Sequence, residues 1–382
     1  METSPHQQQP AVATGSNACT VLIAGASFAG LAAAFWLRKL GYSVTVVEIA
    51  TSIRKGGTPV DIREGVIDVV RRMGLLDRIA AHGLAPRSME YLDAHGSPVA
   101  MQASDADLRD GYEIERDVLL DILFQEVQPD VEFLFGNSIS AFRQFPEEVA
   151  VTFANGEQRS FSLLLGCDGT HSAIRKMCFG EESSFSVFLE NYFSLTIVQK
   201  LLIAENTSQL FNIPGKAVML TAYNNKTDIA FCFFSETEIA YDRRDREQQK
   251  HIMRQHFEHE QWRIPELLEE LGRCDDFYFD KLCQIRMASW SQGRVALVGD
   301  AAYCPSPAAG LGGSMAILGA AALADALEHH PDDLGRALRE YDRSFRPTVQ
   351  EIQRGAVEFG LELFIPRSEE ALRQRNSQLT TV

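Results

Sequence analysis

The sequence predicts an α/β protein in which a mostly parallel sheet is joined to a second, α+β domain with a mostly antiparallel sheet. Three observations predict this fold. A glycine-rich turn near the N-terminus joins an apolar strand to a helix and then to a second strand. Two later apolar strands, "LLLG" and "VALVG", each end beside an aspartate. Between them lies a long region of alternating, strand-like segments, which is typical of antiparallel sheet.

Length, charge and cysteine content limit the class of protein. The 382 residues suffice for two domains or one large composite one. A net charge of −16 argues against nucleic acid or an anionic membrane as a partner. The seven cysteines show no metal spacing, so reduced thiols are expected. With no signal peptide and no apolar run of about 18 residues, we expect a cytoplasmic protein without membrane or metal partners.

The N-terminal part follows the order strand, turn, helix, strand. Residues 19–24 form an apolar, β-branched run, and residues 28–40 carry apolar side chains at helical spacing before Gly41. Residues 42–48 form a second apolar run that ends in an acid. This order predicts a βαβ unit with a parallel sheet.

The turn of this unit has the features of a phosphate-binding loop. Gly25 permits a tight turn and Gly30 lets the helix approach the sheet, although Ser27 stands where the usual pattern has its middle glycine. The unpaired N–H groups at the helix N-terminus would hold a diphosphate. Glu48 stands where a carboxylate accepts hydrogen bonds from a ribose. We therefore expect a dinucleotide site, and a purely structural turn is the alternative.

The central part of the chain predicts antiparallel structure. Residues 148–169 alternate apolar and polar side chains, turn at Asn155-Gly156 and end in a buried strand. From residue 183 onward, strand-like runs and two charged helices predict a second domain. We expect strands at 192–198, 217–222, 229–235 and 278–287, and helices at 65–81, 243–257, 265–272, 311–328 and 334–361.

The expected domain boundaries follow these changes of pattern. We expect a disordered tail at 1–18, a first domain at 19–182 and 286–328, a second domain at 183–285, and a C-terminal helical segment at 329–382. The segment at about 85–108 could belong to either domain. The long C-terminal helix is expected to bridge the two domains.

Two further aspartates end buried strands. Asp168 belongs to "LLLGCDGTHSAIR" (163–175), and Asp300 belongs to "RVALVGDAAYCPSPAAGLGGS" (294–314). Either could be a plain helix N-cap. After Asp300, however, a helix N-terminus is left without bulky side chains, which suits an anionic or electron-rich ligand. The residues that leave it bare are Pro307, Gly310, Gly312 and Gly313.

Taken in order, these motifs resemble a known family. "GASFAG" with Glu48, "DGTHSAIR" and "GDAAYCPSPAAGLGG" are similar to motifs of the group A FAD-dependent aromatic monooxygenases, of para-hydroxybenzoate hydroxylase fold. The resemblance spans residues 19–360. "IRKGGTPVDIR" (53–63) and "DDFYFD" (275–280) look most like the tetracycline destructases. The resemblance implies a Rossmann-like FAD-binding domain of GR2 type, an α+β substrate domain on a mostly antiparallel sheet and a C-terminal bridging helix.

The resemblance also implies roles for individual residues. The first turn would hold the FAD diphosphate, Glu48 the adenosine ribose and Asp300 the ribityl chain. Arg116 would reach the diphosphate and ribose, and the helix beginning near Gly310 would direct N–H groups at the pyrimidine edge of the flavin. The cofactor-binding residues so implied are Gly25, Ser27, Gly30, Glu48, Arg54, Gly57, Asp61, Arg116, Asp168, Asp300, Pro307, Gly310, Gly312 and Gly313, with Arg54 near the flavin ring.

Substrate contacts are expected from the second domain. Aromatic residues stand on its predicted strands, and strand alternation places only half of them on either face. The candidates are Tyr192, Phe211, Phe231, Phe233 and Tyr303. Tyr303 replaces a histidine common in the family, and Ser314 replaces a frequent asparagine, so both departures concern the substrate and the tuning of the flavin.

The resemblance implies an FAD- and NAD(P)H-dependent monooxygenase that uses O₂ and a flavin C4a-hydroperoxide to hydroxylate a phenolic or polycyclic aromatic substrate. Inactivation of a tetracycline-type antibiotic is one reaction that it allows. No protein acid or base is expected to be catalytic, because the flavin carries the chemistry. NADPH or NADH would bind transiently, since only one dinucleotide fingerprint is present. A flavin-dependent reductase or oxidase and a non-catalytic nucleotide-binding regulator are the alternatives. We expect a monomer or a weak homodimer.

Overall fold

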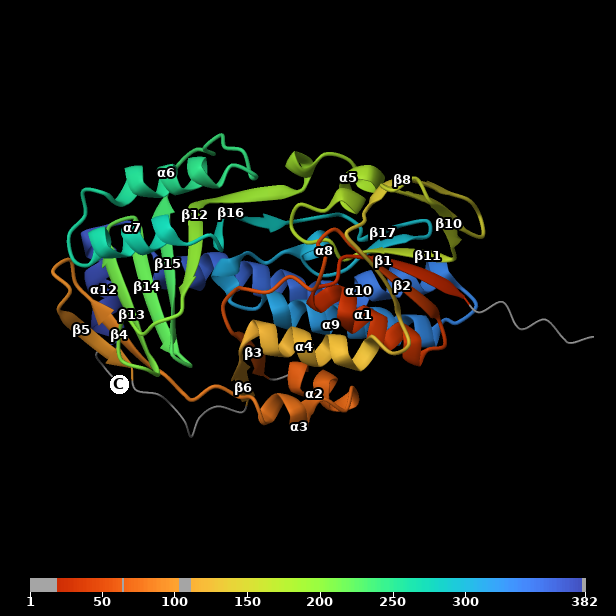
Figure 1. Ribbon diagram of the computed structural model, residues 1–382, viewed down its shortest axis with the longest axis horizontal. Helices are drawn as coiled ribbons and strands as arrows, with labels where there is room; N and C mark the ends of the chain where they lie inside the picture. Colours follow the sequence, from red (N-terminus) through yellow and green to blue (C-terminus); the bar gives the residue numbers. More distant parts are fainter. Residues whose placement is uncertain (1–18, 64, 103–110, 380–382) are drawn as a thin grey trace, which may run out of the picture.

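The structure is a computed structural model that describes residues 19–63, 65–102 and 111–379. The expected tail at 1–18 and part of the segment at 85–108 lie outside these ranges. Figure 1 shows two large sheets side by side along the long axis, the seven-stranded sheet on the left and the six-stranded sheet on the right. No helix within the described ranges is long and apolar enough to cross a membrane.

The six-stranded sheet carries the predicted βαβ unit. Its order is β17-β18-β11-β1-β2-β7, and every pairing except β17 with β18 is parallel. The strands are β1 Thr20–Ala24, β2 Ser43–Glu48, β7 Glu132–Phe135, β11 Leu163–Gly166, β17 Ser291–Gln292 and β18 Val295–Leu297. The inner strands are largely apolar because they are buried within the main core.

Helices and a small sheet complete this core. Helix α1 (Phe28–Lys39) packs against α4 (Arg116–Val127) and α9 (Gly312–His329). A three-stranded antiparallel sheet contributes further core residues from β8 (Ile139–Gln144), β9 (Val149–Phe153) and β10 (Gln158–Phe161). The predicted Asn155-Gly156 turn joins β9 to β10, with Gly156 at φ +86°.

The predicted helix at 65–81 is divided in two. Helix α2 (Gly65–Arg72) ends where Gly74 adopts φ +75°, and α3 (Leu76–Ala80) begins after it. Glycine reaches this left-handed conformation without steric cost and so ends the helix. A two-stranded sheet of β3 (Val60–Arg63) and β6 (Gly111–Ile114) lies close by.

The seven-stranded sheet has the order β16-β12-β15-β14-β13-β4-β5, and only β13 and β4 pair in parallel. Its strands are β4 Ser88–Leu92, β5 Pro98–Gln102, β12 Ser186–Val198, β13 Thr207–Ile213, β14 Lys216–Tyr223, β15 Lys226–Phe234 and β16 Phe277–Ile285. Strands β4 and β5 thus place part of the 85–108 segment in this sheet. Helices α6 (Arg246–Phe257) and α7 (Ile264–Arg273) cover one face (Figure 1).

The C-terminal helices contact the two parts of the structure that are built around the six-stranded and the seven-stranded sheet. Helix α10 (Leu334–Gly355) packs on α9, and α12 (Glu369–Leu379) packs on β5 and β13. The expected single helix at 334–361 is interrupted by π-helical turns at Ala356–Gly360, followed by α11 (Leu361–Phe364). The α/β fold with an α+β second part and a bridging C-terminal segment is therefore confirmed.

A charged cluster ties the two sheets together. His171 follows β11, and its Nδ1 and Nε2 lie 2.9 Å from Glu182 and 2.7 Å from Asp280 of β16. Burial alone would lower the pKa of His171, but the hydrogen bonds and charges of Asp280 and Glu182 outweigh it and raise that pKa to about 9. His171 is therefore protonated at neutral pH, as an imidazolium between the two carboxylates.

We expect this cluster to make stability depend on pH. Because the pKa of His171 is higher in the folded protein than in the unfolded chain, its contribution is complete below pH 6.5 and is lost as the pH rises through 9. The free energy of unfolding should fall by up to about 3 kcal/mol over this window. Urea denaturation between pH 6 and 9.5 measures the change. A His171→Gln variant should remove most of that slope, whereas His259→Gln, at a side chain 88% exposed, should keep it; equal slopes would contradict the assignment.

Candidate functional site

The turn between β1 and α1 is packed so tightly that it requires glycine. Gly25 has φ +104°, and a Cβ there would lie 2.4 Å from the carbonyl oxygen of Cys167. A Cβ on Gly30 would lie 1.9 Å from the carbonyl oxygen of Gly25. The two glycines bring β1, β11 and the start of α1 into direct contact.

The start of α1 leaves its backbone donors available. Ser27 is the N-cap residue, yet its side chain accepts no hydrogen bond from the first turn, and that turn has no acidic residue. Free N–H groups and the helix dipole there favour an anion. Glu48 is fixed beside this end, since its two carboxylate oxygens accept hydrogen bonds of 2.9 Å from Ala26 N and Ala50 N.

Arg116, the first residue of α4, reaches into the same place. Its guanidinium donates to the carbonyl oxygen of Gly56 at 2.7 Å and to Ser27 Oγ at 3.3 Å. Gly57, at φ +112°, makes room for this side chain, because a Cβ would lie 2.6 Å from Arg116 Cδ. Burial lowers the pKa of Arg116, and the nearby charge of Asp300 partly opposes that effect. The loop that contains Arg54 and Gly57 is thus held against the α1 turn.

Asp300 opens the short helix α8 (Asp300–Tyr303) directly after the β18 strand. Burial raises its pKa to about 6, against the opposing effects of Cys304, Arg116 and Thr170. Arg175, from α5 (Ala173–Phe179), braces this helix by donating from Nη1 to the carbonyl oxygen of Ala301 at 2.9 Å. The carboxyl group is therefore held in a fixed position with spare acceptor capacity.

The N-terminus of α9 faces Asp300. A Cβ on Gly312 would lie 3.9 Å from Asp300 Oδ1, and a Cβ on Gly313 would lie 2.9 Å from Val60 Cγ1. No side chain caps α9, and its first turn has no acid. Before it, Pro307 begins a 3₁₀ turn (Pro307–Ala309) that Gly310 ends at φ +66°.

Two of the predicted cofactor residues have local structural contacts. Asp168 accepts hydrogen bonds from Ser172 Oγ and from Ile174 N, so it stabilises the start of α5 (Ala173–Phe179). Asp61 lies on β3, where its side chain pairs with Arg63 at 2.9 Å and its carbonyl oxygen accepts from Ser314. The N-cap residue of α5 is Ser172, and Asp168 supports this end of the helix through these two contacts.

The structure places the predicted substrate aromatics away from this cradle. Tyr192, Phe211, Phe231 and Phe233 are each at most 2% exposed and form the core between the seven-stranded sheet and helices α6 and α7. Their side chains point at α6 and α7, so they stabilise the packing of these helices on the seven-stranded sheet. The opposite face of the sheet carries different residues.

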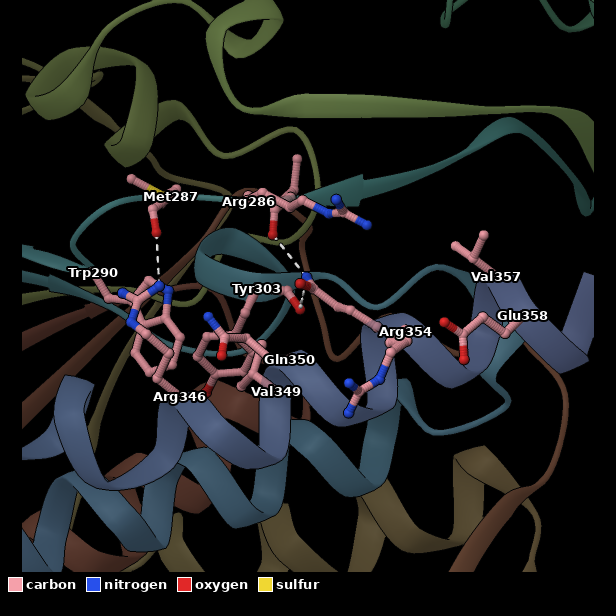
Figure 2. Close-up of a pocket in the computed structure, with 12 residues that line it drawn as sticks. Arg286, Met287, Trp290, Tyr303, Arg346, Val349, Gln350, Arg354, Val357 and Glu358 are labelled. Atoms are coloured by element: carbon pink, nitrogen blue, oxygen red, sulfur yellow. Dashed lines mark hydrogen bonds between the residues drawn. The ribbon is translucent and has the colours of Figure 1, made fainter.

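Tyr303 is also a core residue. It is 1% exposed, and its ring lies 4.7 Å from that of Trp290 (Figure 2). Its hydroxyl lies 3.1 Å from that of Tyr341, in space that Gly319 leaves open. Tyr303 therefore stabilises the packing of α8 on α9 and α10.

The sheet face toward the cradle is lined by residues that alternate with the buried aromatics. Phe193 pairs with Cys232 across β12 and β15, and Phe193 and Ala308, of the turn before α9, both pack against the apolar cluster that contains Cys232. Tyr278 on β16 lies on this face with its ring 6.4 Å from that of Phe193, and it is 43% exposed. Sequence alternation could have indicated these residues, once the helix-covered face was known.

The residues present fit a bound FAD. Two uncapped helix N-termini and a buried arginine converge with two fixed carboxylates, Glu48 and Asp300, in a glycine-lined cradle. Helix N-termini suit a diphosphate and an electron-rich ring edge, and carboxylates suit sugar hydroxyls. Within the described ranges, no group of three or more His, Cys, Asp or Glu side chains is arranged to hold a metal ion.

Sequence comparisons establish the class. The FAD binding domain family matches residues 18–356, and the chain belongs to this family. A flavin-dependent monooxygenase from an unknown prokaryotic organism is 33% identical over 365 residues, which cover 94% of each chain. A flavin-dependent monooxygenase from Legionella longbeachae is 32% identical over 341 residues, which cover 88% of this chain and 87% of the relative. These matches confirm the prediction of an FAD-dependent monooxygenase.

Solved structures agree with this assignment. The tetracycline destructase Tet(51) has a TM-score of 0.84 and 30% identity, with 95% of this chain and 96% of the other covered. Tet(55) has a TM-score of 0.83 and 32% identity, with 95% of each chain covered. HpxO of Klebsiella pneumoniae, solved with FAD and uric acid, shares the fold at 21% identity, with a TM-score of 0.77 and coverage of 95% and 93%.

Proposed function

We propose that the protein is an NAD(P)H-dependent hydroxylase of a phenolic or polycyclic aromatic compound, with tetracyclines as the first class to test. The observation that supports this most is the likeness to two tetracycline destructases, at 30% and 32% identity over nearly the whole chain. The aromatic pair of partly buried Phe193 and half-exposed Tyr278 beside the cradle suits a flat substrate.

The protein's part in the reaction is to bind, orient and exclude water. FAD, reduced by NADPH or NADH, supplies the activation of O₂ and the transfer of one oxygen atom to the substrate. The N–H groups of Gly312 and Gly313 would stabilise negative charge at the pyrimidine edge of the bound flavin. Asp300 would hold the ribityl chain, and Arg116 and the α1 N-terminus would hold the diphosphate. Phe193, Cys232 and Ala308, which belong to one apolar cluster, would limit the access of water to one side of the site.

The decisive experiment uses the purified yellow protein. Tetracyclines and simple phenols are added separately with NADPH or NADH under isotopically labelled dioxygen. We expect at least one compound to stimulate coenzyme consumption and to yield a product that carries one labelled oxygen atom. A product that differs from its substrate by two hydrogens would instead identify a reductase or oxidase, and no stimulated consumption by any compound would exclude both proposed substrate classes.

A further inference from the structure

A cavity of about 570 Å³ lies between α10 and the segment that joins β16 to β17, and Tyr303 of α8 also lines it (Figure 2). The α10 side supplies Gln350, Gln353 and Arg354, and the opposite side supplies Arg286. Neither the cofactor cradle nor the sheet face toward it uses these side chains. The cavity therefore needs its own explanation.

The charge of the cavity is opposite to that of the protein. Three arginines and one acid, Glu358, line it, whereas the whole chain has a net charge of −16. Arg346 is already fully engaged, because it donates to Asp342 at 2.6 Å and to the Met287 carbonyl at 2.8 Å and lies over the Trp290 ring. It forms a fixed wall of the cavity.

The other two arginines have donors to spare. Arg286 directs Nε and Nη2 at Gln284 Oε1, at 3.1 and 2.6 Å, and its Nη1 has no hydrogen-bond partner among the described residues. Arg354 is exposed and, within the same ranges, has neither an ion pair nor a side-chain hydrogen bond. Within the described ranges neither guanidinium group has an ion pair, and two such cations at one cavity favour a carboxylate, which accepts charge-assisted hydrogen bonds from both.

The floor of the cavity is rigid and partly apolar. Gln353 is 6% exposed, and its amide donates to the carbonyl oxygens of Ile285 at 2.9 Å and Cys304 at 3.2 Å. Val349 is 3% exposed, and Val357, at 38%, presents an apolar side wall. A preformed cavity with an apolar wall and a few polar groups is typical of sites for small organic ligands.

We propose that this cavity binds a small organic acid, with its carboxylate held by Arg286 and Arg354 and its apolar body against Val349 and Val357. The Tyr303 side chain, buried in the core, separates the cavity from the cradle, so the acid would act as an effector and would not touch the flavin. Gln353 connects the cavity to Cys304, directly after α8. The proposal stands apart from the identity of the oxidised substrate.

The test uses the FAD-loaded protein and fluorine NMR, with para-trifluoromethylbenzoate as the probe and the matching neutral benzamide as the charge control. We expect saturable binding of the acid and at least tenfold weaker binding of the amide. Arg286→Ala and Arg354→Ala should each weaken binding of the acid by about tenfold or more, and Gln350→Trp should prevent binding by filling the cavity. Arg343→Ala, on the same helix but outside the cavity with its side chain 81% exposed, should change nothing.

Thermal unfolding and the flavin absorption spectrum accompany each titration. If Arg286→Ala unfolds, Arg286→Lys replaces it and should retain part of the binding. Equal affinity for acid and amide, or no saturable binding up to millimolar probe, would overturn the proposal. So would binding that all cavity variants retain while the flavin spectrum shifts, because the acid would then occupy the oxidation site.

Discussion

Replacing Asp300 with alanine is expected to strip FAD from the protein during purification. The carboxyl group stands at the start of α8, within van der Waals reach of the α9 N-terminus, and burial has raised its pKa to about 6. Hydroxyl donors of the ribityl chain would satisfy it there. Loss of hydrogen bonds to a charged buried group costs about 1.5–3 kcal/mol, so we expect roughly 10–100-fold weaker FAD binding. Titration of the apoprotein with FAD measures the effect.

Two variants make this result specific. Asp300→Asn keeps an acceptor oxygen and should retain more flavin than the alanine variant. Asp332→Ala, at an exposed position after α9, should bind FAD as the parent does. If the Asp300→Ala variant kept its flavin content, the proposal that Asp300 binds the ribityl chain would be wrong.

Gly25→Ala is expected to be strongly destabilising, because it adds a methyl group to one of the tightest points of the cradle. The new Cβ would lie 2.4 Å from the Cys167 carbonyl oxygen, at a φ of +104° that alanine adopts only with strain. Backbone strain and overpacking each cost about 1–3 kcal/mol, so we expect about 3 kcal/mol or more of lost stability. Denaturant unfolding and flavin content should both report this loss.

Gly41→Ala is the matched control. Gly41 also has a left-handed backbone, at φ +86°, but nothing lies within 4 Å of the position that the added methyl group would take. Strain alone should cost about 1 kcal/mol there, with FAD retained. If the two variants were equally stable, close backbone contact at the β1–α1 turn would not be what requires glycine at position 25.

Local sequence predicted the cradle well because its parts are set by local geometry. The α1 turn, Glu48 and the bare α9 N-terminus follow from short motifs in which glycine and strand-end acids have few other uses. Arg116 needed the family resemblance, since nothing in "IERDVLL" alone shows that its guanidinium crosses to Gly56 and Ser27. Contacts between residues far apart in sequence depend on packing that no local pattern contains.

The substrate face could not be predicted for the same reason. Period-two alternation separates Tyr192 from Phe193, but it does not say which of them points at the helices. That choice depends on where α6 and α7 pack, and they cover the face of Tyr192. The motif that contains Tyr303 suggested a contact with the substrate, whereas its contacts with Trp290 and Tyr341 place this residue in the core.

The two-sided sheet has an evolutionary consequence. One side, with Phe231 and Phe233, secures the α6–α7 layer, and changes there should be purged because they threaten folding. The opposite face, with Phe193 and Tyr278, does not support the α6–α7 layer, so substitutions there are less constrained by folding. New substrate specificities can therefore evolve in this fold through a few substitutions on one face of the sheet, while the fold itself is retained.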